Sequence, residues 1–237
     1  MEALLASGLE ALGLAGRVPP DAPALLDRYG AALLEKNQVM NLTAITRPED
    51  VAALHMLDSA ALLNCVPLTG NSLIDVGTGA GFPGMVLKLL LPSLSVTLLD
   101  GLQKRLSWLD SLAGQWGLSG LKCLHARAEE AGRDPALREQ FDCAAARAVA
   151  DLRVLCELCL PFVKVGGQFL AMKGVECGPE VDAALPAIQA LGGEVARVWD
   201  YPIPRTGITH RVVVVEKRRA TPDALPRRWA RIQKSPL

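Results

Sequence analysis

Apolar residues recur at helical spacing over the first part of the chain, and no strand-like run precedes residue 72. The spacing predicts helices over residues 4–14 and 22–34, and a third from Thr46 to about Leu63. Thr46-Arg-Pro-Glu49 has the form of a capping box with proline in the first turn. We therefore expect residues 1–70 to form a helical N-terminal region.

Short apolar runs then alternate with helical patterns. The runs predict strands at 72–76, 95–99, 120–125, 141–146, 166–171, 194–201 and 208–216. The helical patterns cover 83–91, 102–116, 151–160 and 177–191; in the second, the apolar face is Leu102, Leu106, Leu109 and Leu112. This alternation predicts an α/β fold over 71–216, with a doubly wound, seven-stranded, mostly parallel sheet. The last two strands have a short loop between them, so one should be antiparallel.

A glycine-rich turn follows the first of these strands. The chain reads Asp75-Val-Gly-Thr-Gly-Ala-Gly81 and then Phe82-Pro-Gly84, before an apolar helical pattern. Strand, glycine turn and helix build a nucleotide-sized pocket at the carboxyl end of a strand. Residues 79–84 match the dinucleotide fingerprint G-x-G-x-x-G. Residues 75–81 match the D-x-G-x-G-x-G loop of S-adenosylmethionine-dependent methyltransferases, with Gly77, Gly79 and Gly81 in the loop.

The acid before the first glycine bears on the choice between these cofactors. A carboxylate at Asp75 would repel a pyrophosphate, whereas it would attract the ammonium and sulfonium groups of S-adenosylmethionine. Asp100 ends the second strand, where an acid holds a ribose diol that both cofactors carry. The charge of Asp75 therefore favours S-adenosylmethionine, with a dinucleotide oxidoreductase as the alternative.

Bulk composition agrees with one large α/β domain and an appendage, since the 237 residues are 50% hydrophobic and 21% charged. The N-terminus lacks a basic n-region, and no uninterrupted apolar run reaches membrane-spanning length. We expect a cytoplasmic protein with no membrane contact. The six cysteines, Cys156 and Cys159 among them, lie on apolar strands and helices, so we expect buried thiols and no metal site.

Charge is distributed unevenly along the chain. Residues 1–70 carry four basic and eight acidic side chains, whereas residues 217–237 carry seven basic and one acidic. This basic C-terminal tail includes Arg227, Arg228, Trp229 and Arg231. On charge alone it is either a polyanion contact or a solvated terminus.

The acceptor is narrowed by what the fourth strand and its loop contain. Enzymes that methylate exocyclic amines of bases carry an Asn/Asp-Pro-Pro-Tyr/Phe loop here, and this chain has Ala145-Ala-Arg-Ala-Val-Ala150 instead. Methylation of a pyrimidine carbon needs a nucleophilic cysteine, and Cys143 has the apolar neighbours of a core residue. A ring nitrogen such as guanine N7 has a free lone pair and needs neither device.

Several side chains are placed by the pattern at the mouth of this pocket. Arg147 ends the fourth strand, so we expect it to contact the cofactor or the target nucleotide; the alternative is a surface arginine paired with Asp151. Ala128 and Glu129 follow the third strand, where such folds contact adenine. His55 and Asp58 face the cleft or pair locally, and the sequence does not choose between these arrangements.

Segments along the whole chain resemble the ribosomal RNA small subunit methyltransferase G family, also called glucose-inhibited division protein B. Those that carry the resemblance are Asn41–Thr46, His55–Ser59, Asp75–Gly84, Thr97–Asp100 with Lys104-Arg105, Ala126–Glu129, Arg147-Ala148, Leu170–Gly174, His210-Arg211 and Pro226–Arg228. The chain departs from the family at Gly101, where relatives usually have serine. It departs again at Trp229, since relatives tend to follow the arginine pair with proline or glycine.

The resemblance implies a class I S-adenosylmethionine-dependent methyltransferase fold and a function. The function is methyl transfer from S-adenosylmethionine to N7 of a single guanine, position 527, in the 530 loop of 16S ribosomal RNA. It implies cofactor contacts at Gly77, Phe82, Ala128, Glu129 and Arg147, with Arg147 also catalytic. We expect RNA contacts at Lys104, Arg105, Lys173, His210, Arg211, Arg227, Arg228 and Arg231, and a monomer.

Two further functions remain open from the sequence. One is a methyltransferase of the same fold that acts on a small molecule, which the basic tail and Lys104-Arg105 disfavour. The other is a ribosome-assembly or RNA-binding factor that retains a cofactor pocket without turnover. Intact Asp75, Asp100 and loop glycines disfavour this second alternative.

Overall fold

A seven-stranded sheet runs through the computed structural model, which describes residues 1–68, 71–147 and 150–237. Within these residues the strand order is β3-β2-β1-β4-β5-β7-β6, and only β7 runs antiparallel to its neighbours. The strands are β1 (Ser72–Val76), β2 (Ser95–Asp100), β3 (Leu121–His125), β4 (Phe141–Arg147), β5 (Val163–Gly174), β6 (Gly193–Pro202) and β7 (Thr209–Lys217). The mostly parallel, doubly wound sheet predicted from the pattern is confirmed.

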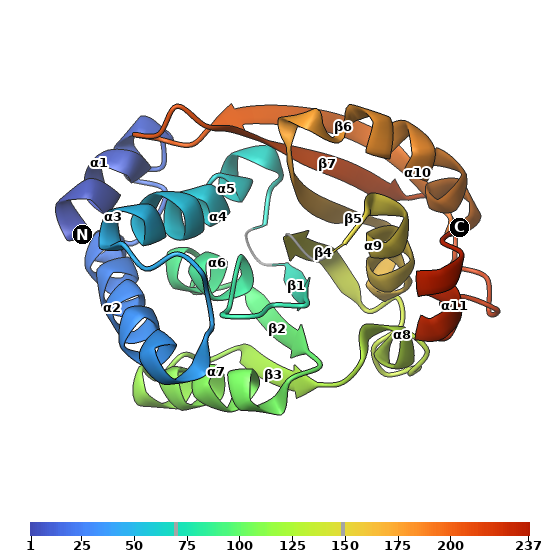
Figure 1. The fold of residues 1–237 in the computed structure, drawn as a ribbon, viewed down its shortest axis with the longest axis horizontal. Coiled ribbons are helices and arrows are strands. Elements are labelled where there is room, and N and C mark those ends of the chain that lie inside the picture. Colours follow the sequence, from blue (N-terminus) through green and yellow to red (C-terminus); the bar gives the residue numbers. More distant parts are fainter. Residues whose placement is uncertain (69–70, 148–149) are drawn as a thin grey trace.

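Helices cover both faces of this sheet (Figure 1). Those before β1 are α1 (Glu2–Ala11), α2 (Ala22–Met40), α3 (Pro48–Val51), a π-helical turn (Ala52–Leu57), α4 (Asp58–Ala60) and α5 (Leu62–Cys65). Those after it are α6 (Gly84–Leu90), α7 (Gln103–Gln115), α8 (Ala128–Ala131), α9 (Leu152–Cys159), α10 (Gly178–Ala190) and α11 (Trp229–Lys234), with 3₁₀ turns at Leu160–Phe162 and Val175–Cys177.

The alternation of side chains along each strand divides the core into two layers. In β1, Leu73 joins the layer formed with α1, α2, α6 and α7, and Ile74 joins the layer formed with α9 and α10. Ile232 of α11 is fully buried in that second layer. The N-terminal helices therefore share one apolar core with the sheet, because their apolar faces lie against α6 and the strands.

Most element boundaries match the pattern, and two local expectations do not. The third helix begins after Arg47 rather than Thr46, and no side chain caps it, so the capping box is not formed. Leu102 lies before the first turn of α7 and is 46% exposed, whereas Leu106, Leu109 and Leu112 are buried as expected. Within the basic tail, Trp229–Lys234 form the short helix α11. Ala148 of the Arg147-Ala148 segment lies outside the described residues.

The topology brings three charged side chains to one edge of the sheet. β1 lies between β2 and β4, and successive crossovers leave β1 in opposite directions. The carboxyl ends of these three strands carry Asp75, Asp100 and Arg147. At such a switch point the connecting loops diverge and leave a crevice for a ligand.

Candidate active site

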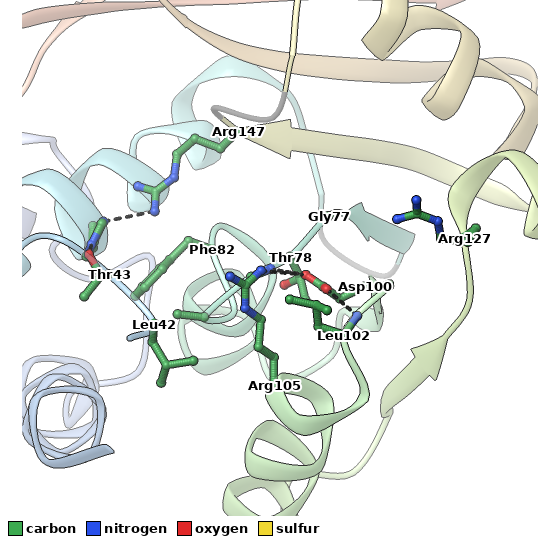
Figure 2. Close-up of a pocket in the computed structure, with 14 residues that line it drawn as sticks. Leu42, Thr43, Gly77, Thr78, Phe82, Asp100, Leu102, Arg105, Arg127 and Arg147 are labelled. Carbon is green, nitrogen blue, oxygen red and sulfur yellow. Dashed lines mark hydrogen bonds and ion pairs between the residues drawn. The ribbon is translucent and has the colours of Figure 1, made fainter. Parts of the chain in front are cut away.

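A cavity of about 570 Å³ opens at the carboxyl ends of β1, β2 and β4. Figure 2 shows Arg147 at one end of it, Arg127 at the other, and Asp100, Leu102 and Arg105 grouped between them. We call it the larger cavity, to distinguish it from a smaller one beside it. The described residues that line it are Leu42, Thr43, His55, Gly77, Thr78, Gly79, Ala80, Phe82, Asp100, Gly101, Leu102, Arg105, Arg127 and Arg147. Five predicted cofactor residues are among them: Gly77, Gly79, Phe82, Asp100 and Arg147.

The glycine loop is shaped by the side chain of Asp75 beneath it. Asp75 Oδ2 accepts hydrogen bonds from Thr78 Oγ1 (2.6 Å) and from the backbone N–H of Gly84 (2.8 Å). A Cβ on Gly84 would lie 2.8 Å from that same oxygen, so the close approach requires glycine. Gly81 has φ +92° and packs against the Tyr29 hydroxyl, which donates a hydrogen bond to Ala80 O.

Asp75 lies behind the loop rather than on the cavity surface. Its side chain is fully buried, and Oδ1 has no hydrogen-bond partner among the described residues. Burial raises the pKa of Asp75 to about 6, against hydrogen bonds from Thr78 and Gly84 and the charge of Arg147, which lower it. At neutral pH this carboxylate is mostly ionised. It therefore sets a negative charge under the loop while holding the loop in shape.

Asp100 ties β2 to both of the loops that flank the larger cavity. Its Oδ2 accepts a hydrogen bond from the N–H of Gly79 (2.9 Å) and lies 3.6 Å from Nη1 of Arg105. Its Oδ1 accepts a hydrogen bond from the N–H of Leu102 (2.8 Å). The acid predicted to hold a diol thus reaches the cavity, with Arg105 as its nearest cation.

A smaller cavity of about 290 Å³ adjoins the larger one, and Gly77, Asp100, Gly101 and Arg127 line both. Its other walls are Val76, Leu99, Ala126, Ala128, Glu129, Leu158 and Trp229. Ala128 and Glu129, predicted as cofactor contacts, therefore lie one cavity away from Arg147. Trp229 was not predicted here, since nothing in the linear pattern brings the tail to β1 and β2.

Arg147 lies at the opposite end of the larger cavity, where its guanidinium contacts several neighbouring residues at once. Its Nη1 donates hydrogen bonds to Leu54 O (2.9 Å) and Asp58 Oδ2 (3.2 Å), and its Nη2 lies 3.0 Å from His55 Nδ1. The guanidinium carbon is 4.9 Å from the centre of the Phe82 ring. The alternative pairing with Asp151 is not formed, because Asp151 pairs with Arg153 at 3.0 Å.

Asp58 connects this arginine to β6 and β7. It is 1% exposed, and its Oδ1 accepts hydrogen bonds from Tyr201 (2.7 Å) and His210 Nδ1 (2.8 Å). Burial pushes the pKa of Asp58 upward, but the hydrogen bond from His210 and the charge of Arg147 outweigh burial and lower it. The same hydrogen bond raises the pKa of His210. The sequence left open whether His55 and Asp58 face the cleft. In the structure both residues line a cavity at this end of the cleft.

A third cavity of about 460 Å³ adjoins the larger one, with which it shares His55 and Arg147. The other residues that line it are Ile45, Leu54, Asp58, Met172, Lys173, Gly174, Ile208 and His210. We call it the side cavity. It draws on the N-terminal helices, β5 and β7, so it exists only because the N-terminal region packs across the end of the sheet.

His55 is held as a neutral imidazole between three neighbours. Its ring stacks on Phe82 with centroids 4.5 Å apart, and Nε2 lies 2.8 Å from Thr43 Oγ1. Because Arg147 donates to Nδ1, the ring hydrogen belongs on Nε2 and points to Thr43. Burial and the nearby Arg147 charge lower the pKa of His55 to about 4.

This low pKa predicts an acid-dependent loss of stability. An unfolded histidine has a pKa of 6.5, so between pH 6.5 and 4 the unfolded chain binds a proton that the folded protein does not. The stability that neutral His55 contributes is present above pH 6.5 and lost as pH falls towards 4, in total about 3 kcal/mol. Between pH 6.5 and 4, the free energy of unfolding should fall by about 3 kcal/mol less in His55→Gln than in the unaltered protein, as measured by urea unfolding at each pH. Identical pH dependence of the free energy of unfolding in both proteins would refute this prediction. The raised pKa of Asp75 also affects stability in this pH range, but Asp75 is present in both proteins, so its contribution cancels in the comparison.

The residues predicted to contact RNA are divided by the structure into paired and exposed cations. Lys173 pairs with Glu180 (2.6 Å), Arg211 with Asp200 (2.6 Å) and Arg227 with the buried Glu157 (2.6 Å). Lys104, Arg228 and Arg231 are exposed on α7 and in the tail. Arg227 anchors the tail through a buried ion pair, so among the tail residues predicted to contact RNA only Arg228 and Arg231 are exposed.

Buried thiols account for most of the cysteines, as expected. Cys156 and Cys159 are fully buried on α9, and Cys143 is 3% exposed on β4. Burial raises the pKa of Cys143 to about 12, so its thiol stays protonated at neutral pH. Among the described residues, no helix is long and apolar enough to cross a membrane.

The fold of this chain is similar to those of solved methyltransferase structures. The chain is similar to the S-adenosylmethionine-dependent O-methyltransferase of Thermotoga maritima (TM-score 0.53, 20% identity, covering 80% of this chain and 73% of that one). It is also similar to TYW2 of M. jannaschii in complex with AdoMet (TM-score 0.54, 13% identity, covering 68% and 76%). At these identities the likeness shows a class I methyltransferase fold.

Sequence relatives extend over the whole chain. The chain is 43% identical over 235 residues to ribosomal RNA small subunit methyltransferase G of Alkaliphilus metalliredigens, covering 99% of this chain and 98% of that one. It is 45% identical over 241 residues to the protein of the same name from Symbiobacterium thermophilum, covering 99% and 97%. The family model for rRNA small subunit methyltransferase G matches residues 23–203. A chain with this site and these relatives belongs to the ribosomal RNA small subunit methyltransferase G (GidB) family.

Proposed function

We propose that this protein transfers a methyl group from S-adenosylmethionine to N7 of a single guanine, position 527, in the 530 loop of 16S ribosomal RNA. One observation carries the proposal: three cavities follow one another along the carboxyl edge of the sheet. Asp100 lines the smaller and larger cavities, and Arg147 lines the larger and side cavities. S-adenosylmethionine has an adenosine end and a methionine end, which would extend through the smaller and larger cavities. The side cavity would then remain for the nucleotide that accepts the methyl group.

The residues present fit S-adenosylmethionine. Asp75 Oδ1, which has no hydrogen-bond partner among the described residues, puts negative charge beneath the glycine loop, and this charge suits a cationic methionine moiety. Asp100 is placed to accept hydrogen bonds from a ribose diol. The smaller cavity, with Val76, Leu99 and Leu158 as apolar walls, would take the adenine ring beside Ala128 and Glu129. When bound, this cofactor supplies an electrophilic methyl group.

The side cavity is the place for the target base. It adjoins the larger cavity at Arg147, and Asp58, Lys173 and His210 line it. His55 and Asp58 have their polar atoms engaged with neighbours, so these groups orient and do not accept a proton. Guanine N7 has no proton to lose, and its methylation needs positioning and charge stabilisation alone. The site's chemistry therefore matches that acceptor.

Transfer of labelled methyl tests the function directly. The protein would be incubated with methyl-labelled S-adenosylmethionine and small ribosomal subunits from a strain that lacks it, and the label located by nuclease mapping. We expect label on N7 of one guanine in the 530 loop. Label on another position would overturn the assigned target, and cofactor binding without any transfer would favour the assembly-factor alternative.

Exposed arginines of the tail provide a separate prediction about RNA. Arg228→Ala combined with Arg231→Ala should weaken binding to 16S RNA and reduce the slope of log K against log salt by about two, one for each lost phosphate contact. Cofactor affinity should not change. Lys122→Ala, an exposed cation on the edge strand β3, is the matched control. An unaltered salt slope in the double variant would show that the tail does not contact RNA.

A further inference from the structure

The C-terminal tail reaches the cofactor end of the cleft. Trp229, the first residue of α11, is half-buried and lines the smaller cavity together with Val76 of β1 and Leu99 of β2. Figure 1 shows α11 beside α8 and α9, on the side of the sheet away from the N-terminal helices. A segment about 130 residues further along the chain thus completes a wall of the pocket that the first strands build.

The tail is held there by a buried ion pair and by backbone contacts. The carboxylate of Glu157, fully buried on α9, accepts hydrogen bonds from the backbone N–H and Nε of Arg227 (both 2.8 Å) and from its Nη2 (2.6 Å). Arg133 Nε donates to Pro226 O (2.7 Å), and Arg138 Nη1 donates to Leu225 O (2.8 Å). These hydrogen bonds are made by the residues that precede Trp229 in the sequence, so they fix the backbone from which the indole projects.

The order of the cavities shows which part of the cofactor meets this indole. The methyl group must lie next to the side cavity, at the Arg147 end of the larger cavity. The ribose belongs at Asp100, which lines both other cavities. The smaller cavity is therefore left for the adenine. There the Trp229 ring lies 6.0 Å from the guanidinium carbon of Arg127, and Arg127 Nε is 3.9 Å from Glu129.

We propose that Trp229 is a cofactor-binding residue whose indole, held in place by the segment Pro226–Lys234, forms the outer wall of the adenine site. The indole offers an apolar face to a flat heteroaromatic ring, with Arg127 and Glu129 as polar neighbours. The inference rests on the proposed function for the identity of the cofactor. It adds that the tail is part of the cofactor site and not only a basic extension.

Calorimetric binding of two probes tests this assignment. S-adenosylhomocysteine fills both cofactor cavities, whereas 5′-methylthioadenosine carries only the adenosine end. Trp229→Ala should raise the Kd of both probes by about tenfold, the effect of losing one aromatic wall against a base. Trp229→Phe should stay within about threefold, since it keeps a ring. Gln233→Ala, an exposed position on the same helix, is the control and should bind as the unaltered protein does.

Fluorescence provides a second readout that does not depend on the alanine variant. The chain has four tryptophans, and adenine binding should change the emission of Trp229. Trp229→Phe should therefore lose most of the emission change seen on adding S-adenosylhomocysteine. Unchanged Kd for 5′-methylthioadenosine in Trp229→Ala, or an unchanged emission response in Trp229→Phe, would overturn the inference alone. Failure of the unaltered protein to bind either probe would overturn the proposed function as well.

Discussion

Arg147→Ala should lower the rate of methyl transfer to small ribosomal subunits by about 100-fold. The guanidinium of Arg147 lies where the larger and side cavities meet, and it bonds to Leu54 O, Asp58 and His55 at once. Its loss frees the His55 ring and the Asp58 carboxylate from their common partner. Both cavities then lose the group that, in the proposed function, positions the methyl group relative to the acceptor.

The measurement is the initial rate at saturating cofactor, with the Kd of S-adenosylhomocysteine measured separately. Arg147→Lys keeps the charge but not the three-way contact, so its rate should remain well below that of the unaltered protein. Arg153→Ala is the matched control, because Arg153 pairs with Asp151 outside the three cavities. If Arg147→Ala retained more than a third of the rate, the assignment of a catalytic role to Arg147 would be wrong.

Arg227→Ala should lower the free energy of unfolding by about 3 kcal/mol. Its partner Glu157 is fully buried, and removal of the arginine leaves that buried carboxyl group without its cationic partner beside the second core layer. For a chain of this size, a loss of about 3 kcal/mol in the free energy of unfolding corresponds to a fall of about 9 °C in Tm. Thermal and urea unfolding measure it.

Two further variants separate the ion pair from other effects of the substitution. Arg228→Ala, at the exposed next position, should change the free energy of unfolding by no more than about 0.5 kcal/mol. Adding Glu157→Gln to Arg227→Ala should restore more than half of the loss, because no buried carboxylate then remains unpaired. Equal losses in Arg227→Ala and Arg228→Ala would contradict the anchoring role of this pair.

Strand tips were the part of the site that periodicity could locate. Asp100 and Arg147 end apolar runs, and parallel strands bring their carboxyl ends to one edge, so the sequence pattern predicts both at the cleft. Asp75 was expected there for the same reason, yet it lies behind the loop. The pattern records that a residue ends a strand but not which hydrogen bonds its side chain makes, and Thr78 and Gly84 draw this carboxylate inward.

Contacts between distant segments could not be obtained in this way. Asp58 meets Tyr201 and His210, about 140 and 150 residues away in sequence, and no local signal relates them. The π-helical turn and the short helices α8 and α11 are also too brief to leave a clear periodic signal. The sequence showed that the tail is basic, but it did not show that Arg227 forms a buried ion pair. That pair depends on the packing of the tail against α9, which carries Glu157.

By itself, the sequence determined the parallel sheet, the glycine loop and the acids at the ends of β1 and β2, because these depend on side-chain period and on local turn chemistry. The same residues favoured S-adenosylmethionine through the sign of one charge. Tertiary structure alone decided that Asp75 supports the loop, that Arg147 joins two cavities, and that the tail turns Trp229 into a pocket wall. Those outcomes depend on packing between segments far apart in the chain, where burial and hydrogen-bond geometry select the partners.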